Sequence, residues 1–115
     1  MTDDWEKLTG AAAAEVEATR RALPDLLRKR AEALPVTFEP RPNRAQRREG
    51  VEPDTLGLFV GNEFQYEESS ASPLPPQIIL YLQNLWEQAE GQEEVFREEV
   101  RITFLHELGH FLGLD

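Results

Sequence analysis

Apolar residues recur at helical spacing near the start of the chain. Positions three or four apart carry Trp5, Leu8, Ala12 and Val16. Such a stripe is typical of a helix with one buried face. Asp3 followed by Glu6 three residues later resembles a capping box. The pattern therefore predicts a helix that has Asp3 as its N-cap and ends at about Ala22.

A second apolar group follows Pro24. It consists of Leu26, Leu27 and Leu34, which we expect to form the apolar side of the next segment. Proline is compatible with the first turn of a helix but disrupts a helix interior. Pro24 therefore either begins a second helix or kinks the first one, and Pro35 ends the helical pattern.

Three later segments have the pattern of β-strands. Val36 and Phe38 alternate with polar residues until Pro40, which predicts a short strand at the edge of a sheet. Residues 55–61 alternate in the same way. Residues 77–82 are almost entirely apolar, as expected for a central strand that is covered on both faces.

The segments between these strands are polar. Residues 41–53 read as a loop that concentrates Arg41, Arg44, Arg47 and Arg48. The loop is either simply solvated or a basic patch that faces a substrate. Residues 62–76, rich in Glu, Ser and Pro, predict another loop.

The C-terminal third returns to helical patterns. Residues 84–90 predict a helical turn, interrupted by Gly91, and a long helix follows from Gln92 or Glu93 to at least Leu112. Helices, then strands, then a helix indicate the α+β class. We expect one domain over residues 1–115, with a small three-stranded sheet packed against the N-terminal helices and the C-terminal helix.

Composition narrows the chemistry. The chain has no Cys, which excludes disulfides, thiolate zinc sites and cysteine nucleophiles. Its net charge of -10 argues against nucleic acid and anionic membranes as partners. The N-terminus is acidic where a secretory signal needs basic residues, and no apolar stretch is long enough to span a membrane. We therefore expect a cytoplasmic location.

Both histidines of the chain lie in the predicted C-terminal helix, in the sequence His106-Glu107-Leu-Gly-His110. Residues four apart on a helix are separated by only about 40° around its axis, so both imidazoles can reach one metal ion. Apolar residues cover most of the remaining helix surface: Phe104, Leu105, Leu108, Phe111 and Leu112. We expect the helix to be largely buried, with its polar strip facing a cleft.

This spacing has a known chemistry. In the His-Glu-x-x-His pattern the two imidazoles bind Zn²⁺, and the carboxylate acts as general base toward the attacking water. Here His106 and His110 are the predicted zinc ligands and Glu107 is the predicted base. Two histidines placed at random, with Glu after the first, match this pattern in roughly one chain in 400.

A hydrolytic zinc site needs a third protein ligand. In the extended pattern a Gly turns the chain three residues after the second His, and a ligand follows three residues later. Gly113 occupies the Gly position, but the ligand position would be 116 and Asp115 stands one residue early. Either Asp115 binds through a tighter turn, or another carboxylate completes the site, or two His and waters hold the metal, or the sequence stops before its third ligand.

The chain resembles the small bacterial zincin-like metallopeptidases, also called minimal zincins. The resemblance extends over most of the length and is most specific from Val100 to Asp115, which includes the motif and Gly113. It implies an α+β zincin domain with a small sheet packed against the motif helix and a zinc site at His106, Glu107 and His110. The metzincin pattern is also similar up to Gly113, but Met1 is the only Met, so no Met-turn is present.

The leading hypothesis is therefore a zinc-dependent hydrolase of peptide bonds, with a peptide or protein substrate that pairs with a sheet edge. The alternative is a metal-binding or protein-interaction module with the zincin fold and little or no activity. A purely structural His pair is the third reading. Tyr66 and Tyr81 could supply an oxyanion donor, but packing within a loop and a strand is the stronger interpretation of both.

Overall fold

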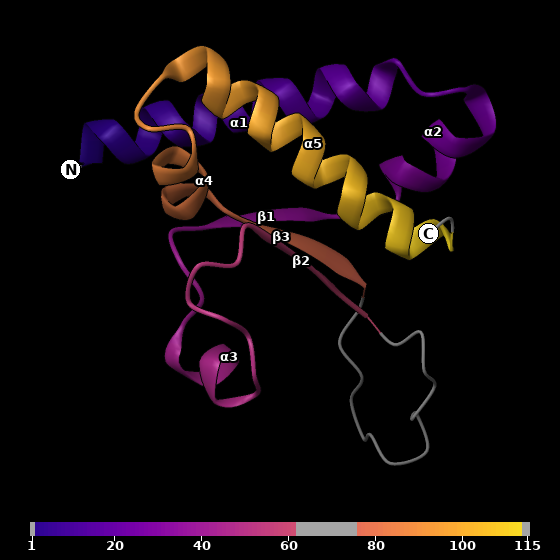
Figure 1. The fold of residues 1–115 in the computed structure, drawn as a ribbon. Coiled ribbons are helices and arrows are strands. Elements are labelled where there is room, and N and C mark those ends of the chain that lie inside the picture. The colour runs from indigo at the N-terminus through magenta and orange to yellow at the C-terminus, as the bar shows by residue number, and fades with distance from the viewer. Residues whose placement is uncertain (1, 62–75, 114–115) are drawn as a thin grey trace.

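The patterns of the sequence produce the predicted kinds of element over most of the chain that the computed structural model describes, residues 2–61 and 76–113 (Figure 1). The elements are, in order, α1 (Thr2–Arg21), α2 (Asp25–Glu32), β1 (Val36–Glu39), α3 (Arg44–Arg48), β2 (Gly57–Val60), β3 (Gln77–Tyr81), α4 (Leu82–Gln88) and α5 (Glu93–Leu112). The predicted α+β class is confirmed.

Strand β3 is the centre of the sheet, whose order is β1-β3-β2. It runs parallel to β1, with Val36 opposite Ile78, and antiparallel to β2, with Gly57 opposite Leu80. Both Leu80 and its neighbour Tyr81 are fully buried. Because adjacent strand residues point to opposite faces, β3 is covered on both faces, as its apolar sequence predicted.

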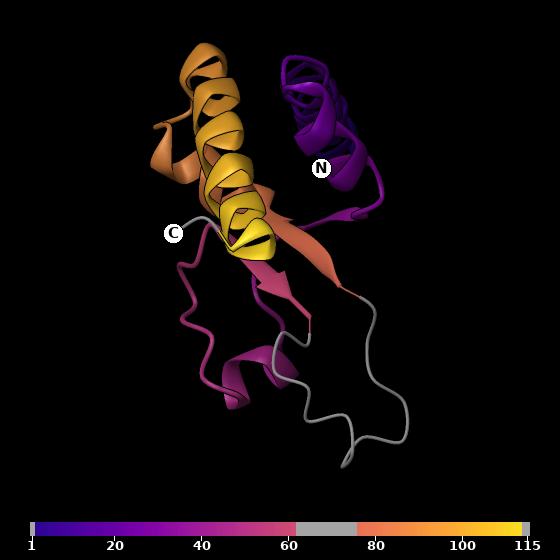
Figure 2. The same ribbon diagram turned by 90° about the vertical axis from the view of Figure 1, so that its right-hand side faces the viewer.

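Helices α1 and α5 lie side by side over one face of the sheet, and α3 lies on the other side (Figures 1 and 2). One buried residue per turn of α5 faces this core: Phe96, Val100, Phe104 and Leu108. The predicted stripe of α1 packs into the same core through Leu8, Ala12 and Val16. Burying each large apolar side chain contributes roughly 1.5–3 kcal/mol, so this core holds α5 firmly on the sheet.

The N-terminal helix begins earlier than predicted. It starts at Thr2, so Asp3 lies within its first turn and the prediction of Asp3 as N-cap is wrong. The helix dipole favours acidic residues at every position of the first turn. The pair Asp3 and Glu6 therefore does not identify the residue at which the helix begins. The helix ends at Arg21, within one residue of the predicted end. Pro24 precedes a separate helix, α2.

The apolar side of α2 differs from the prediction. Leu26 is 79% exposed, whereas Ala31 and Leu34 are buried and Leu27 is partly buried. Residues 27 and 31 are four apart and share one face of α2, while Leu26 lies about 100° away from Leu27 around the axis. Leu34 is buried just after the end of this helix. Leu26 was therefore wrongly assigned to the buried side.

The predicted loop over residues 41–53 contains the short helix α3. Asn43 is its N-cap: the Gln46 backbone N–H donates to Asn43 Oδ1 at 2.8 Å, and the Asn43 N–H donates to Gln46 Oε1 at 3.0 Å. This is a capping box formed by Asn and Gln. A loop prediction was wrong here because the helix is too short to show an apolar period.

The remaining differences concern boundaries. Strand β2 covers residues 57–60 rather than 55–61, and β3 ends at Tyr81 rather than at residue 82. The turn expected at residues 84–90 is a helix that begins at Leu82 and ends at Gln88. The long C-terminal helix has the predicted bounds, with Gln92 as N-cap. The loop expected over residues 62–76 lies almost wholly outside the described residues.

Candidate metal centre

The motif helix packs tightly against the sheet at Gly57, the first residue of β2. A Cβ atom at this position would lie 2.5 Å from Thr103 Cγ2, 3.2 Å from Leu80 Cδ2 and 3.4 Å from Glu107 Cγ. The first distance is too short for two carbon atoms in van der Waals contact, which requires about 3.5–4.0 Å. Glycine therefore permits α5 to pack directly on β2 and brings Glu107 against the start of this strand.

A second contact between the same two elements lies one helical turn further along. The rings of Phe59 and Phe111 are 5.7 Å apart between centroids and tilted by 57°. Aromatic pairs at this distance stabilise packing by roughly 0.5–1.5 kcal/mol beyond the burial of their surface. Gly57 and Phe59 are two apart and share a strand face, and Glu107 and Phe111 are four apart and share a helix face. The two contacts together fix the orientation of α5 about its own axis.

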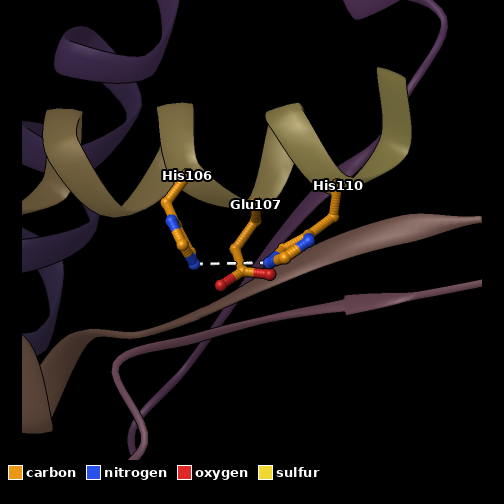
Figure 3. Close-up of side chains that lie close together, drawn as sticks. All are labelled: His106, Glu107 and His110. Carbon is orange, nitrogen blue, oxygen red and sulfur yellow. Dashed lines mark hydrogen bonds between the residues drawn. The ribbon is translucent and has the colours of Figure 1, made fainter. Parts of the chain in front are cut away.

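The two histidines project from α5 with their ring nitrogens close together (Figure 3). Nε2 of His106 lies 3.3 Å from Nε2 of His110, and the rings are nearly perpendicular. Two nitrogen ligands at about 2.0–2.1 Å from a tetrahedral zinc lie about 3.3–3.4 Å apart. The observed separation therefore fits two ligands of one metal ion. Both side chains are exposed, so an ion can reach them.

Glu107 completes the group. One ligand atom from each of His106, Glu107 and His110 lies within 4.8 Å of the others. In Figure 3 its carboxylate lies next to the dashed line that joins the two imidazoles. Unlike the histidines, Glu107 is only 9% exposed, because its stem packs on β2. The arrangement thus provides a potential metal site with a carboxylate held beside it.

The third ligand is not supplied by the residues that the structure describes. Within ranges 2–61 and 76–113, no further His, Asp or Glu joins the group. Gly113 ends α5 in the left-handed conformation, with φ 74°, as expected for the Gly that turns the chain after the motif. Asp115, one of the alternatives predicted for the third ligand, is outside the described residues, so its role stays a prediction.

The chain also matches a known family. The family model of zincin-like metallopeptidases matches residues 31–115. The chain belongs to this family. The matched region begins within α2 and contains the sheet, α3, α4 and the whole motif helix. No curated protein matches the chain. The resemblance that the motif indicated is thus confirmed.

The two tyrosines considered as oxyanion donors have different outcomes. Tyr66 lies outside the described residues. Tyr81 points away from α5, since its neighbour Leu80 faces Gly57. The Tyr81 hydroxyl donates to Gln46 Oε1 at 2.9 Å, and burial together with the nearby Glu39 raises the pKa of Tyr81 to about 12. Tyr81 therefore has the packing role that the sequence favoured over that of an oxyanion donor.

Sequence reasoning missed the residues that place the motif on the sheet. Gly57, Thr103 and Phe59 contribute no ligand atom, yet they determine where Glu107 lies. One signal was available, because glycine inside a strand pattern often marks a close approach of another backbone or helix. The partner in that approach cannot be identified from local sequence.

Two further predictions concern the surroundings of the site. A cavity of about 670 Å³ is lined by residues of α1, α4 and the start of α5, including Trp5, Trp86 and Arg97, and by none of the three motif residues. The cleft expected at the motif stays a prediction.

None of the described helices combines the length and the apolar character that crossing a bilayer requires. The expected cytoplasmic location also stays a prediction.

Proposed function

We propose that this member of the zincin-like metallopeptidases hydrolyses peptide bonds with one zinc ion held by His106 and His110. The observation that carries the proposal is the 3.3 Å separation of the two Nε2 atoms, with the Glu107 carboxylate beside them. Neutral imidazoles suit zinc, and their separation fits its tetrahedral geometry. The family supplies the reaction class, because its members are described as metallopeptidases.

The residues of the chain take distinct roles in this reaction. A zinc ion at this site would polarise the scissile carbonyl and make a water molecule more acidic. The Glu107 carboxylate accepts a proton from the attacking water and donates it to the nitrogen of the leaving amine, so it acts first as base and then as acid. Its buried position against β2 holds it in one place for both transfers.

Strand β2 is the proposed binding edge for the substrate. Among the described residues it pairs only with β3, so its other edge can accept an extended peptide. Gly57 and Phe59 of this strand contact the motif helix directly. A peptide added along β2 would therefore lie next to the two histidines, and main-chain hydrogen bonds would orient its carbonyl groups.

Asp115 remains the proposed third ligand. Gly113 turns the chain at the end of α5, two residues before Asp115. If Asp115 binds the metal, Asp115→Asn should weaken zinc binding at least tenfold, because a neutral amide is a poorer ligand than a carboxylate. Asp54→Asn is the matched control, since this exposed residue lies outside the motif. Equal zinc affinity in both variants would exclude Asp115.

The proposal is tested with Glu107→Gln. We expect the wild-type protein loaded with zinc to cleave members of a peptide library, and the variant to lose nearly all activity while binding zinc stoichiometrically. Glu94→Gln makes the same change of charge at an exposed position of the same helix and should retain activity. Cleavage at equal rates by the wild type and Glu107→Gln would contradict the assigned role.

A second candidate is a metal-binding or interaction module with little catalytic power. It is favoured by one observation, namely that the described residues offer only two histidines and one carboxylate to a metal. Under this alternative the protein binds zinc but cleaves no peptide of the library at any zinc concentration. Zinc stoichiometry and turnover, measured on the same preparation, separate the two functions.

A further inference from the structure

Three arginines of α3 form a basic patch in an otherwise acidic protein. Arg44, Arg47 and Arg48 are all exposed. Their spacing of three and four residues places them on one face of the short helix. The chain carries a net charge of -10. The patch defined by these three residues is therefore a positively charged area on a protein whose net charge is negative.

None of these three guanidinium groups forms an ion pair with a carboxylate of residues 2–61 or 76–113. Glu49 and Glu52 follow closely in the sequence but do not pair with them. Arg41, the fourth arginine of the segment, differs: it contacts Glu87 at 2.6 Å and donates to Asn84 Oδ1 at 2.8 Å. Arg41 thus connects the segment before α3 to α4, whereas the three arginines of the patch make no such structural contact.

The patch is held in a fixed position on the sheet. Gln46 lies on the same short helix, and its side-chain oxygen accepts hydrogen bonds from the Asn43 N–H and the Tyr81 hydroxyl. Tyr81 itself is fully buried in the central strand. Like charges at this spacing repel one another, so a short helix with three arginines on one face needs such support. The three charges are therefore preorganised toward solvent.

We propose that Arg44, Arg47 and Arg48 form a docking surface for an acidic segment of a protein partner. Guanidinium groups bind carboxylates through paired hydrogen bonds, and three of them match a short run of Asp or Glu. A nucleic acid fits less well. Without these three positive charges the rest of the chain carries -13, because -10 minus +3 is -13. A long polyanion would be repelled beyond the patch, whereas a short acidic segment contacts the patch alone.

The docking surface is separate from the proposed active site. Leu80 points toward α5 and Tyr81 toward α3, so the sheet lies between the metal centre and the patch (Figures 1 and 2). Docking does not require hydrolysis, and the proposal holds whether or not the chain is a peptidase. Binding is therefore measured without zinc and in the Glu107→Gln background, where no cleavage interferes.

The test compares two variants with equal net charge. Arg44→Gln, Arg47→Gln and Arg48→Gln are combined in one protein, and Lys7→Gln, Arg21→Gln and Lys29→Gln in the other. The second set removes exposed charges from α1 and α2. The probe is a fluorescent peptide with six consecutive glutamates, and its glutamine counterpart serves as the neutral probe. Circular dichroism establishes that both variants remain folded.

We expect the α3 variant to bind the glutamate peptide at least about tenfold more weakly than the parent protein, and the control to change affinity less than about threefold. Binding should weaken as salt rises from about 0.02 M to 0.15 M, since the contacts are exposed. Equal losses in both variants, or equal affinity for the glutamine peptide, would overturn the proposal. Tighter binding of a hexanucleotide than of the glutamate peptide would overturn it in favour of nucleic acid.

Discussion

Replacing Gly57 with alanine should destabilise the protein by pushing the motif helix away from β2. The new Cβ would lie 2.5 Å from Thr103 Cγ2. Ordinary carbon contacts need about 3.5–4.0 Å, so the two atoms must separate by roughly 1 Å or more. The contacts of the same Cβ with Leu80 and Glu107, at 3.2 and 3.4 Å, limit the directions in which the structure can relax.

Overpacking of this kind costs about 1–3 kcal/mol. Alanine also restricts the unfolded chain and thereby returns about 0.4–1 kcal/mol. We therefore expect a net loss of about 1–2 kcal/mol in the free energy of unfolding, measured by urea denaturation without zinc. Because Glu107 lies at the same contact, the variant should also lose peptidase activity if the proposed mechanism holds.

Thr103→Ser provides the decisive comparison, because serine lacks Cγ2 and keeps the hydroxyl. In the Gly57→Ala and Thr103→Ser double variant the clash disappears, and a double-mutant cycle should give a favourable coupling of at least about 1 kcal/mol. Gly10→Ala is the control: its Cβ meets nothing within 4 Å, and in helix α1 it should stabilise by about 1 kcal/mol. A neutral effect of Gly57→Ala, or a coupling near zero, would refute this account of the packing.

Three further predictions follow from other contacts. Zinc at about 100 times its dissociation constant should raise the free energy of unfolding by about 2.7 kcal/mol. His106→Ala or His110→Ala should abolish the corresponding rise in Tm, and the same rise in these variants as in the wild type would exclude the site. Asn84 is buried and donates to the carbonyl oxygens of Pro53 and Thr55 at 2.8 and 2.9 Å, so Asn84→Ala should cost about 2–3 kcal/mol in urea denaturation; a loss below about 0.5 kcal/mol would contradict this role. The pKa of Tyr81 in the folded protein is about 12, above its ordinary value, so the neutral phenol stabilises the fold. This contribution to the free energy of unfolding, up to roughly 3 kcal/mol, is fully present below about pH 10 and is lost as the pH rises toward 12. Tyr81→Phe should flatten this alkaline decline in stability, and an identical decline in the variant would contradict the prediction.

The candidate metal centre was largely predictable because its geometry is local. Residues four apart on a helix share a face wherever that helix lies, so His106 and His110 were expected to converge before any tertiary contact was known. Gly113, whose left-handed conformation ends the helix, also acts within one helical turn of the residues that it affects. The family model matches residues 31–115, which include the motif helix, and the motif is what indicated the family in the sequence.

The errors occurred where a pattern had to be interpreted without its neighbours. Leu26 is apolar but exposed, because the buried face of α2 contains Ala31 instead. Helix α3 depends on a capping box and on a hydrogen bond from Tyr81, which is 35 residues away from Gln46. A distant partner of this kind leaves no periodic signal in the segment that it stabilises.

The sequence by itself determined the class of the fold, the motif helix, and the placement of two imidazoles and a carboxylate close together. All three depend on the spacing of residues that are near one another in the chain. Only the tertiary structure decided that β2 is the edge strand beside this helix, that Gly57 lets Glu107 settle against it, and that three arginines lie beyond the opposite face of the sheet. The physical reason is that strand pairing and helix packing join residues tens of positions apart, and the preference for one partner over another comes from the summed packing of the whole core.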